Sequence, residues 1–441
     1  MAETVKGVPK RILSSLLESL SAGVVPRKGA PYVAIGRELE VSSLLDALEG
    51  VSDGGSFMKL IIGRYGSGKS FLIQLVRGYA VEKGFVCCDA DLSPERRLYG
   101  AKGNGLATYK ELIKNMCTKT SPDGNSLQSL IAKWISATQS EVALSGLMVG
   151  TKEFDDEVEK RIYSVTSRAE SQVGGFDFAT VINAIYKAHK TDDDLLKANA
   201  FRWLRGEFST KTEAKSALKV SSIINDENWY DYIKLFAFFV REIGYKGLVI
   251  FIDECVNLYK ITNRISREAN YEKLLSMFND TLQGNANGLG IVLGGTPMFL
   301  EDKRRGLFSY EALKSRLEEG RYSTGEFKNL MGPVIRLERL DDNQLYALVL
   351  RVKNLHGQNY NWEVPINDSE AETFLRDCLS RAGAEKMITP REVIRDFIEV
   401  LNILYQNPTA KFLDIVKVNA DKAENADIKN NNQFDLSDIE L

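Results

Sequence analysis

The glycine-rich segment at residues 63–70 carries the clearest chemical pattern in the chain. It reads Gly-Arg-Tyr-Gly-Ser-Gly-Lys-Ser and fits G-x-x-x-x-G-K-[ST] without a gap. Glycines let the backbone curl so that successive N–H groups point at one anion. Lys69 would place its ammonium at the β- and γ-phosphates, and Ser70 would offer its hydroxyl to Mg²⁺. Arg64 and Tyr65 occupy variable positions and receive no individual role. The predicted nucleotide-binding residues are Gly63, Arg64, Tyr65, Gly66, Ser67, Gly68, Lys69, Ser70 and Phe71.

A second chemical pattern is the acid pair Asp253-Glu254, which follows the apolar run 248–252. At the end of a buried strand, Asp253 would hold Mg²⁺ through water, and Glu254 would orient and polarise the attacking water. Exposed acid pairs at strand ends are common, but a complete phosphate-binding pattern upstream favours the catalytic interpretation. The glutamate favours hydrolysis over a simple switch. ATP and Mg²⁺ are therefore the expected ligands.

The elements around both patterns predict an α/β fold. The apolar run 58–62 reads as a strand that leads directly into the loop, and an amphipathic helix follows the loop and ends at Gly84. The run before the acid pair is continuously apolar, as in a buried parallel sheet. Further strands are expected at 85–92, 289–297 and 332–340. Together they predict the P-loop NTPase fold, a three-layer arrangement with a parallel sheet.

The chain is long enough for two or three domains, with 441 residues. Between the second strand and the acid-pair strand lies a stretch too long for an ordinary crossover, and its periodicity is helical. The last residues are polar and are expected to form a mobile tail. The predicted division is an N-terminal helix and connector (1–30), an ATPase core (31–100 and 231–340), a helical insertion (101–230), a helical lid or C-terminal domain (341–420) and the tail (421–441).

Composition excludes several classes of protein. No apolar stretch is long enough to span a bilayer and the start lacks a signal-peptide core, so we expect a cytoplasmic protein without membrane contact. The five cysteines show no metal-ligand spacing. With only two histidines, a His-rich metal site or Ser-His-Asp chemistry is disfavoured. The net charge of −3 argues against general nucleic-acid affinity.

Two further segments, together with the patterns above, resemble AAA+ ATPases of the origin-recognition and STAND-like branch. They are the Gly36-Arg37-Glu38 box before the loop and the strand end Gly294-Gly295-Thr296-Pro297. The resemblance implies an AAA+/ASCE core with a C-terminal helical lid. It also implies that Thr296 is the sensor 1 residue, although Thr296-Pro297 could simply start a turn.

Two arginine positions follow from the same resemblance. The segment 313–317 resembles the box that carries an arginine finger, which makes Arg316 the candidate finger and Arg321 the second. A guanidinium can bridge γ-phosphate oxygens as charge develops there. Arg391, after Thr389-Pro390, resembles a sensor 2 residue. The alternatives are a solvated helix face for Arg316 and a capped helix with an exposed arginine for Arg391.

A closer resemblance spans residues 10–405. The segments SAGVVP, IGRE, GRYGSGKSFL, FIDECVNLYK and TPREVIRDF together are similar to the ATP-binding protein family of BREX-type phage-defence operons. Similar ATPases occur in related defence islands such as Shango, beside a helicase and a TerB-like protein. The resemblance implies partners among other defence-operon proteins, such as a helicase, a TerB-like protein or an effector.

Three functions remain open from the sequence. The first is a motor or switch ATPase in a defence complex, acting as a homo-oligomer with ATP between subunits if Arg316 is a finger. The second is an ATP-dependent DNA-binding clamp or loader for a partner helicase or effector. The third is a STAND-like sensor with slow hydrolysis. A small-molecule kinase fits poorly, because no acceptor site is recognisable.

Overall fold

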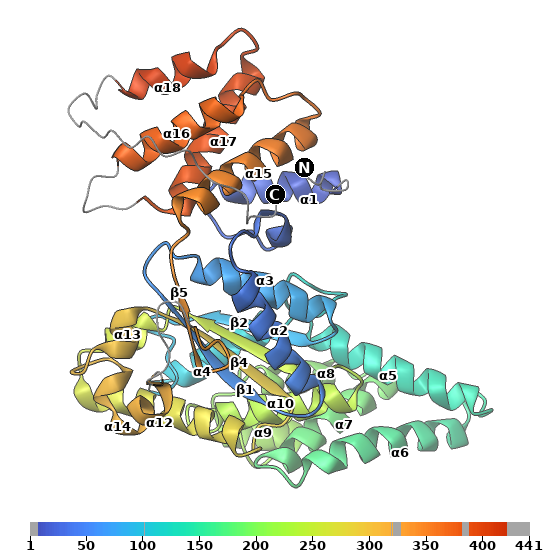
Figure 1. The fold of residues 1–441 in the computed structure, drawn as a ribbon. Coiled ribbons are helices and arrows are strands. Elements are labelled where there is room, and N and C mark those ends of the chain that lie inside the picture. Colours follow the sequence, from blue (N-terminus) through green and yellow to red (C-terminus); the bar gives the residue numbers. More distant parts are fainter. Residues whose placement is uncertain (1–7, 101, 319, 321–327, 382–387, 421–441) are drawn as a thin grey trace. The chain divides into compact units, whose positions relative to one another are not determined.

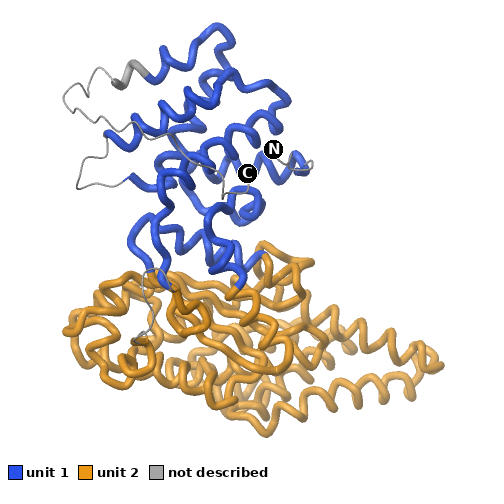
Figure 2. The backbone as a smooth tube through the Cα atoms, viewed as in Figure 1, with its two compact units in different colours: residues 1–42, 63–78, 336–441 blue, residues 43–62, 79–335 orange. Residues whose placement is uncertain are grey.

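The computed structural model of this protein describes residues 8–100, 102–318, 320, 328–381 and 388–420. The chain divides into two compact units (Figure 2). Unit 1 comprises Met1–Ser42, Gly63–Gly78 and Arg336–Leu441, and unit 2 comprises Ser43–Ile62 and Tyr79–Ile335. The units are described separately below.

A five-stranded sheet has the order β2-β3-β4-β1-β5 (Figure 1). The β1–β4, β3–β4 and β2–β3 pairs are parallel. Continuously apolar stretches form the buried inner strands, as the sequence predicts. The predicted α/β class with a parallel sheet is therefore confirmed. The strands are β1 (Phe57–Gly63), β2 (Val86–Asp91), β3 (Leu248–Asp253), β4 (Leu289–Gly295) and β5 (Val334–Leu337).

Consecutive helices fill the long connection between β2 and β3. Edge-to-face contacts such as Trp134 with Phe239, whose ring centroids lie 5.2 Å apart, join the second of these helices to the last. The same apolar cluster continues into the sheet, so these helices extend the core of unit 2. They are α4 (Asn104–Lys114), α5 (Leu127–Leu144), α6 (Lys152–Ala169), α7 (Gly175–Thr191), α8 (Asp194–Leu204), α9 (Lys211–Leu218) and α10 (Trp229–Glu242).

The other helices associated with the sheet lie close to β1, β3 and β4 in sequence. Two of them, α2 and α3, precede and follow β1, and each continues from one unit into the other. The remaining ones follow β3 and β4. They are α2 (Glu38–Ser52), α3 (Lys69–Glu82), α11 (Val256–Tyr259), α12 (Arg264–Leu282), α13 (Pro297–Glu301), the 3₁₀ turn η2 (Leu307–Ser309) and α14 (Glu311–Leu317).

Unit 1 has a core of its own, in which the N-terminal helix packs against C-terminal helices. Leu16 of α1 is fully buried in one cluster with Val349 of α15 and Phe397 of α17. The two ends of the described chain therefore share a single helical core. Its elements are α1 (Lys10–Ser21), the 3₁₀ turn η1 (Ala30–Val33), α15 (Asp342–Tyr360), α16 (Asp368–Arg381), α17 (Pro390–Gln406) and α18 (Phe412–Ala420).

Lys59 is a charged residue inside β1. It is 7% exposed, and its ammonium donates to the carbonyl oxygens of residues 330, 331 and 332 at 3.0, 2.8 and 2.6 Å. Burial lowers the pKa of this lysine. The three bonds hold the segment that precedes β5 against β1.

We expect Lys59→Met to lower the free energy of unfolding by about 2–3 kcal/mol, because buried carbonyls would lose a charged donor. Urea unfolding followed by circular dichroism measures this. The matched control is Lys246→Met at an exposed lysine of the same unit, which should change little. Equal stability of the two variants would contradict a structural role for Lys59.

Candidate functional site

The glycine-rich loop of unit 1 connects the end of β1 to the first residue of α3, Lys69. Gly66 and Gly68 have φ values of 77° and 87°, which glycine adopts without strain. The Ser67 N–H donates to the carbonyl of Arg64 at 3.2 Å, which closes a turn within the loop. A curled loop that opens onto the N-terminus of a helix is the arrangement that binds phosphate.

Two glycines of the loop are required by close packing. A Cβ at Gly63 would lie 2.9 Å from the carbonyl oxygen of Leu337. A Cβ at Gly66 would lie 2.5 Å from Cγ2 of Thr389, the residue that caps α17. The loop therefore packs directly against the helix that carries Arg391. The Arg391 side chain in turn lies beside Gly23, where an added Cβ would meet Cγ and Cδ at 3.6 Å.

Arg37, from the Gly36-Arg37-Glu38 segment that precedes the loop, donates hydrogen bonds to the loop backbone. Its Nη2 donates to the carbonyl oxygens of Ser67 at 3.0 Å and of Glu338 at 2.7 Å. Arg37 is 7% exposed, and this burial lowers the pKa of its guanidinium. The negative charges of nearby glutamates act in the opposite direction but are the smaller effect. Arg339 adds a longer bond of 3.4 Å to the carbonyl of Tyr65. The sequence signalled Arg37 only as part of a motif, and its contact with the loop was not predicted.

We expect Arg37→Ala to weaken ATP binding by about 10-fold, because the loop loses a charged donor to its backbone. The ATP affinity of Arg37→Lys should lie between those of the wild type and Arg37→Ala, since lysine keeps the charge but lacks the second guanidinium nitrogen, which in Arg37 donates to the Gly36 carbonyl oxygen at 3.3 Å. Isothermal titration with ATP measures both, and Arg11→Ala on the exposed face of α1 is the control. Unchanged affinity in Arg37→Ala would show that the loop holds its shape without this arginine.

Lys69 and Ser70 begin α3, as the pattern predicts. The Lys69 ammonium donates to the carbonyl oxygen of Arg64 at 3.2 Å. It thus folds back over the loop, where it could exchange this bond for a phosphate oxygen.

The acid pair in unit 2 has an unusual backbone. Asp253 ends β3 and is 8% exposed, and its Oδ1 accepts from the N–H of Glu254 at 2.7 Å. Glu254 has φ 57°, in the left-handed region that non-glycine residues rarely adopt. Strain of this kind costs about 1–3 kcal/mol and occurs preferentially at functional sites.

Asn257 holds the strained Glu254 in place. Both its backbone N–H, at 2.9 Å, and its Nδ2, at 3.2 Å, donate to the Glu254 carbonyl oxygen. Nδ2 also donates to the carbonyl of Leu92 at 2.8 Å, which ties the acid pair to the end of β2. The sequence offers two interpretations of Asn257, a residue that holds Glu254 or, in preference, a helix cap; its contact with Leu92 joins segments far apart in the chain and was not predicted.

Asp91, at the end of β2, is a further carboxylate that the sequence did not single out. It stands opposite Asp253 in the parallel pairing. Desolvation, together with the negative charges of Asp253, Asp89 and Glu254, raises the pKa of Asp91. A divalent cation at this strand end would relieve the repulsion.

The residues of the candidate site fit Mg²⁺ that is bound by few protein ligands. No group of three His, Cys, Asp or Glu side chains within the described ranges is arranged to enclose a metal ion. Mg²⁺ commonly uses one or two carboxylates and completes its shell with water and substrate phosphates. Asp253 in unit 2 is a ligand of the type that this mode of binding uses, and so, in unit 1, is the Ser70 hydroxyl.

The remaining predicted residues of unit 2 have local partners. Thr296 directly follows β4, and its hydroxyl accepts from the Phe299 N–H at 3.3 Å as the N-cap of α13. Arg316 is on α14, where Nη1 donates to the Ala312 carbonyl at 2.7 Å and Nε to Asn279 Oδ1 at 3.1 Å. Arg321 lies outside the described residues.

The strand ends show which of these features belong to one edge of the sheet. In the parallel pairings, Ile62 of β1 stands opposite Gly295 of β4, and Ile252 of β3 stands opposite Leu293 of β4. The carboxyl ends of β1, β4, β3 and β2 therefore lie along the same edge. Ligands of open α/β sheets bind at this edge.

Comparison with known proteins gives the family. Within the described part of the chain, no helix has the length and apolar character needed to cross a membrane. No curated protein matches the chain. A family model described as BREX system ATP-binding protein BrxC/D matches residues 8–420. The match covers nearly the whole chain, which therefore belongs to the BrxC/D family of BREX system ATP-binding proteins.

Proposed function

We propose that this protein binds Mg²⁺-ATP and hydrolyses it to ADP and phosphate as part of a phage-defence complex. The observation that carries the proposal is the left-handed Glu254 beside buried Asp253 at the end of β3. A strained glutamate at the strand edge where nucleotides bind is poorly explained by fold stability. It is well explained by a carboxylate that must face a water molecule.

The roles proposed for individual residues follow from their chemistry. The loop backbone and Lys69 bind the phosphates, with Arg37 fixing the loop. Ser70 and Asp253 hold Mg²⁺, which when bound neutralises charge on the β- and γ-phosphates. Glu254 orients the attacking water and accepts its proton.

We further propose an AAA+ type of core at residues 31–100 and 231–340, with a helical insertion at 101–230 and a lid at 341–420. In that scheme Thr296 is sensor 1. Arg391 is sensor 2, and the contact of Gly66 with Thr389 supports its placement, because Thr389 lies two residues before Arg391. Partners are further copies of the chain and other proteins of the defence system, in the cytoplasm.

Arg316 is proposed as the arginine finger that acts on ATP bound to a neighbouring copy. Its side chain is exposed, and it bonds only neutral groups among the contacts described above. Arg316→Ala should lower turnover at least about 100-fold and leave ATP affinity unchanged, because the finger acts on charge that develops during reaction. The assignment would be contradicted if turnover and ATP binding were lost to the same extent, or if neither were lost.

The experiment that tests the proposed function is the ATPase rate of the wild type over a range of protein concentrations, with mass followed by light scattering. Turnover that rises with assembly supports the oligomeric ATPase. Stimulation by duplex DNA with steep salt dependence would favour the clamp or loader. Binding of ATP with a single slow turnover at every concentration would favour the sensor.

A further inference from the structure

The helical hairpin formed by α5 and α6 in unit 2 ends in an exposed apolar tip. In Figure 1 the two helices extend together beyond their neighbours in unit 2. Leu144, Met148 and Val149 at the tip are 87%, 75% and 70% exposed. Leu147 between them packs partly onto the core and so anchors the turn. No charged residue occurs from 142 to 151. Exposed apolar clusters of this kind mark interaction sites.

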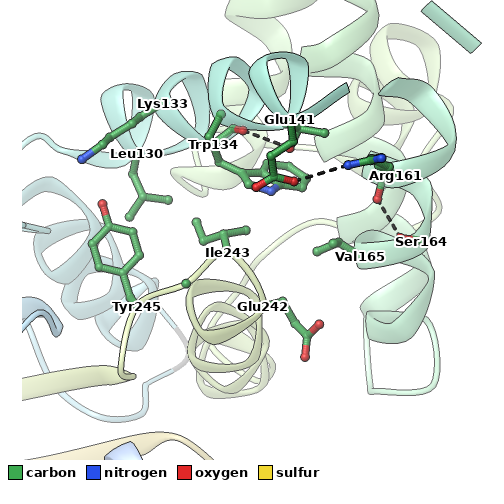
Figure 3. Close-up of a pocket in the computed structure, with 13 residues that line it drawn as sticks. Leu130, Lys133, Trp134, Glu141, Arg161, Ser164, Val165, Glu242, Ile243 and Tyr245 are labelled. Atoms are coloured by element: carbon green, nitrogen blue, oxygen red, sulfur yellow. Dashed lines mark hydrogen bonds and ion pairs between the residues drawn. The ribbon is translucent and has the colours of Figure 1, made fainter. Parts of the chain in front are cut away.

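A pocket lies on the same hairpin, nearer the sheet. It has a volume of about 580 Å³ and lies between α5, α6 and the turn after α10 (Figure 3). Leu130, Trp134, Val165 and Ile243 give it an apolar lining. Pockets of this size accommodate several side chains.

Most charged side chains at the pocket are paired within the chain, and Lys133 is exposed at its lining. Arg161 pairs with Glu157 at 3.1 Å and with Glu141 at 3.5 Å. Glu242 pairs with Arg168 of α6. Because Arg161, Glu141 and Glu242 are paired within the chain, the pocket can take an uncharged occupant whose apolar side chains lie against Trp134 and Ile243, as the tip would.

We propose that two copies of this chain pair through their hairpins, so that the tip of each fills the pocket of the other. Ala137 at the pocket and Leu144 at the tip are both on α5, about 10 Å apart along the helix axis. Two antiparallel hairpins related by a twofold axis would therefore bring both tips to both pockets at once. Such a contact closes on itself and gives a dimer.

Charge complementarity supports this pairing. Glu141 lines the pocket at its end nearer the tip on α5, close to the expected twofold axis, and pairs with Arg161 of α6. In the pair, each Glu141 can meet the Arg161 of the other copy as well as its own. The contact is separate from the proposed nucleotide site, so the proposal goes beyond the proposed ATPase function and does not depend on it.

The first test measures mass without nucleotide by light scattering and sedimentation. The wild type should be a dimer in the micromolar range, and Leu144→Glu with Met148→Glu should weaken the dimer at least about 100-fold. The control is Val173→Glu, an equally exposed apolar residue at another turn of the unit, which should leave the dimer intact. Melting temperatures confirm that all variants fold.

The second test is disulfide trapping, which does not depend on weakening the protein. All five native cysteines are buried, so an introduced surface cysteine reacts alone. A chain with Met148→Cys mixed with a chain carrying Ala137→Cys should form a mixed disulfide dimer under copper-phenanthroline oxidation. Val173→Cys in place of Met148→Cys should not.

Several outcomes would overturn the proposal. They are a monomeric wild type, a dimer that survives the two glutamates, or equal trapping by residues 148 and 173. Binding of the wild type to lipid vesicles that is lost with the two glutamates, without a change in mass, would assign the tip to a membrane instead.

Discussion

Glu254→Gln is expected to abolish ATP turnover while ATP binding is retained. An amide has nearly the shape of the carboxylate but cannot accept a proton from water, so we expect a loss of at least about 10²–10³-fold in rate. The strained backbone of Glu254 is held by Asp253 and Asn257 rather than by its own carboxylate, so the substitution should not disturb the turn. Phosphate release and ATP titration measure the two effects separately.

The matched control for this variant is Glu268→Gln in α12 of the same unit. Glu268 pairs with Arg264 on the helix surface at 2.7 Å, and such pairs contribute little to stability. Turnover of Glu268→Gln should equal that of the wild type. If Glu254→Gln also retained turnover within a few-fold of the wild type, Glu254 would not be the general base.

Lys69→Ala is expected to weaken ATP binding by about 100-fold or more, and turnover should be lost with it. The ammonium is placed at the loop by its bond to the Arg64 carbonyl, so it is available to the phosphates without a large rearrangement. A 100-fold change in affinity corresponds to about 2.7 kcal/mol, which is reasonable for a charged group that binds a phosphate.

Lys83→Ala is the control for Lys69→Ala. Lys83 follows the end of α3 and forms an exposed pair with Glu49 at 3.4 Å. Its removal should leave ATP affinity unchanged. Equal effects of the two substitutions would show that general positive charge, and not the loop lysine, determines binding.

The features that could be predicted from the sequence are those that short contiguous segments define. The loop at 63–70, the acid pair and the apolar strands each depend on residues next to one another, so their patterns identify them without knowledge of the fold. The helical character of the stretch after β2 was also predictable from its periodicity.

The features that were missed depend on contacts between distant segments. Asp91 faces Asp253 only because β2 and β3 pair in one register, although about 160 residues separate them in the chain. Arg37 reaches the loop backbone across 30 residues, and Asn257 reaches Leu92 across 165. No local pattern encodes such contacts.

The contact between the loop and the C-terminal helices could not be predicted from the sequence either. Thr389 was recognisable as a helix cap, and the structure shows the full capping box with Glu392. Its contact with Gly66 could not be read from either segment. Within unit 1, that contact joins the loop directly to the N-terminus of α17.

ATP hydrolysis by this protein is tested most directly by steady-state phosphate release from Mg²⁺-ATP by the purified wild type, with Lys69→Ala and Glu254→Gln prepared in parallel. We expect sustained release over many turnovers by the wild type, which stops when Mg²⁺ is chelated, and none above background from either variant. Release that is equal in all three preparations, or absent from the wild type at every protein concentration while it binds ATP, would contradict this expectation.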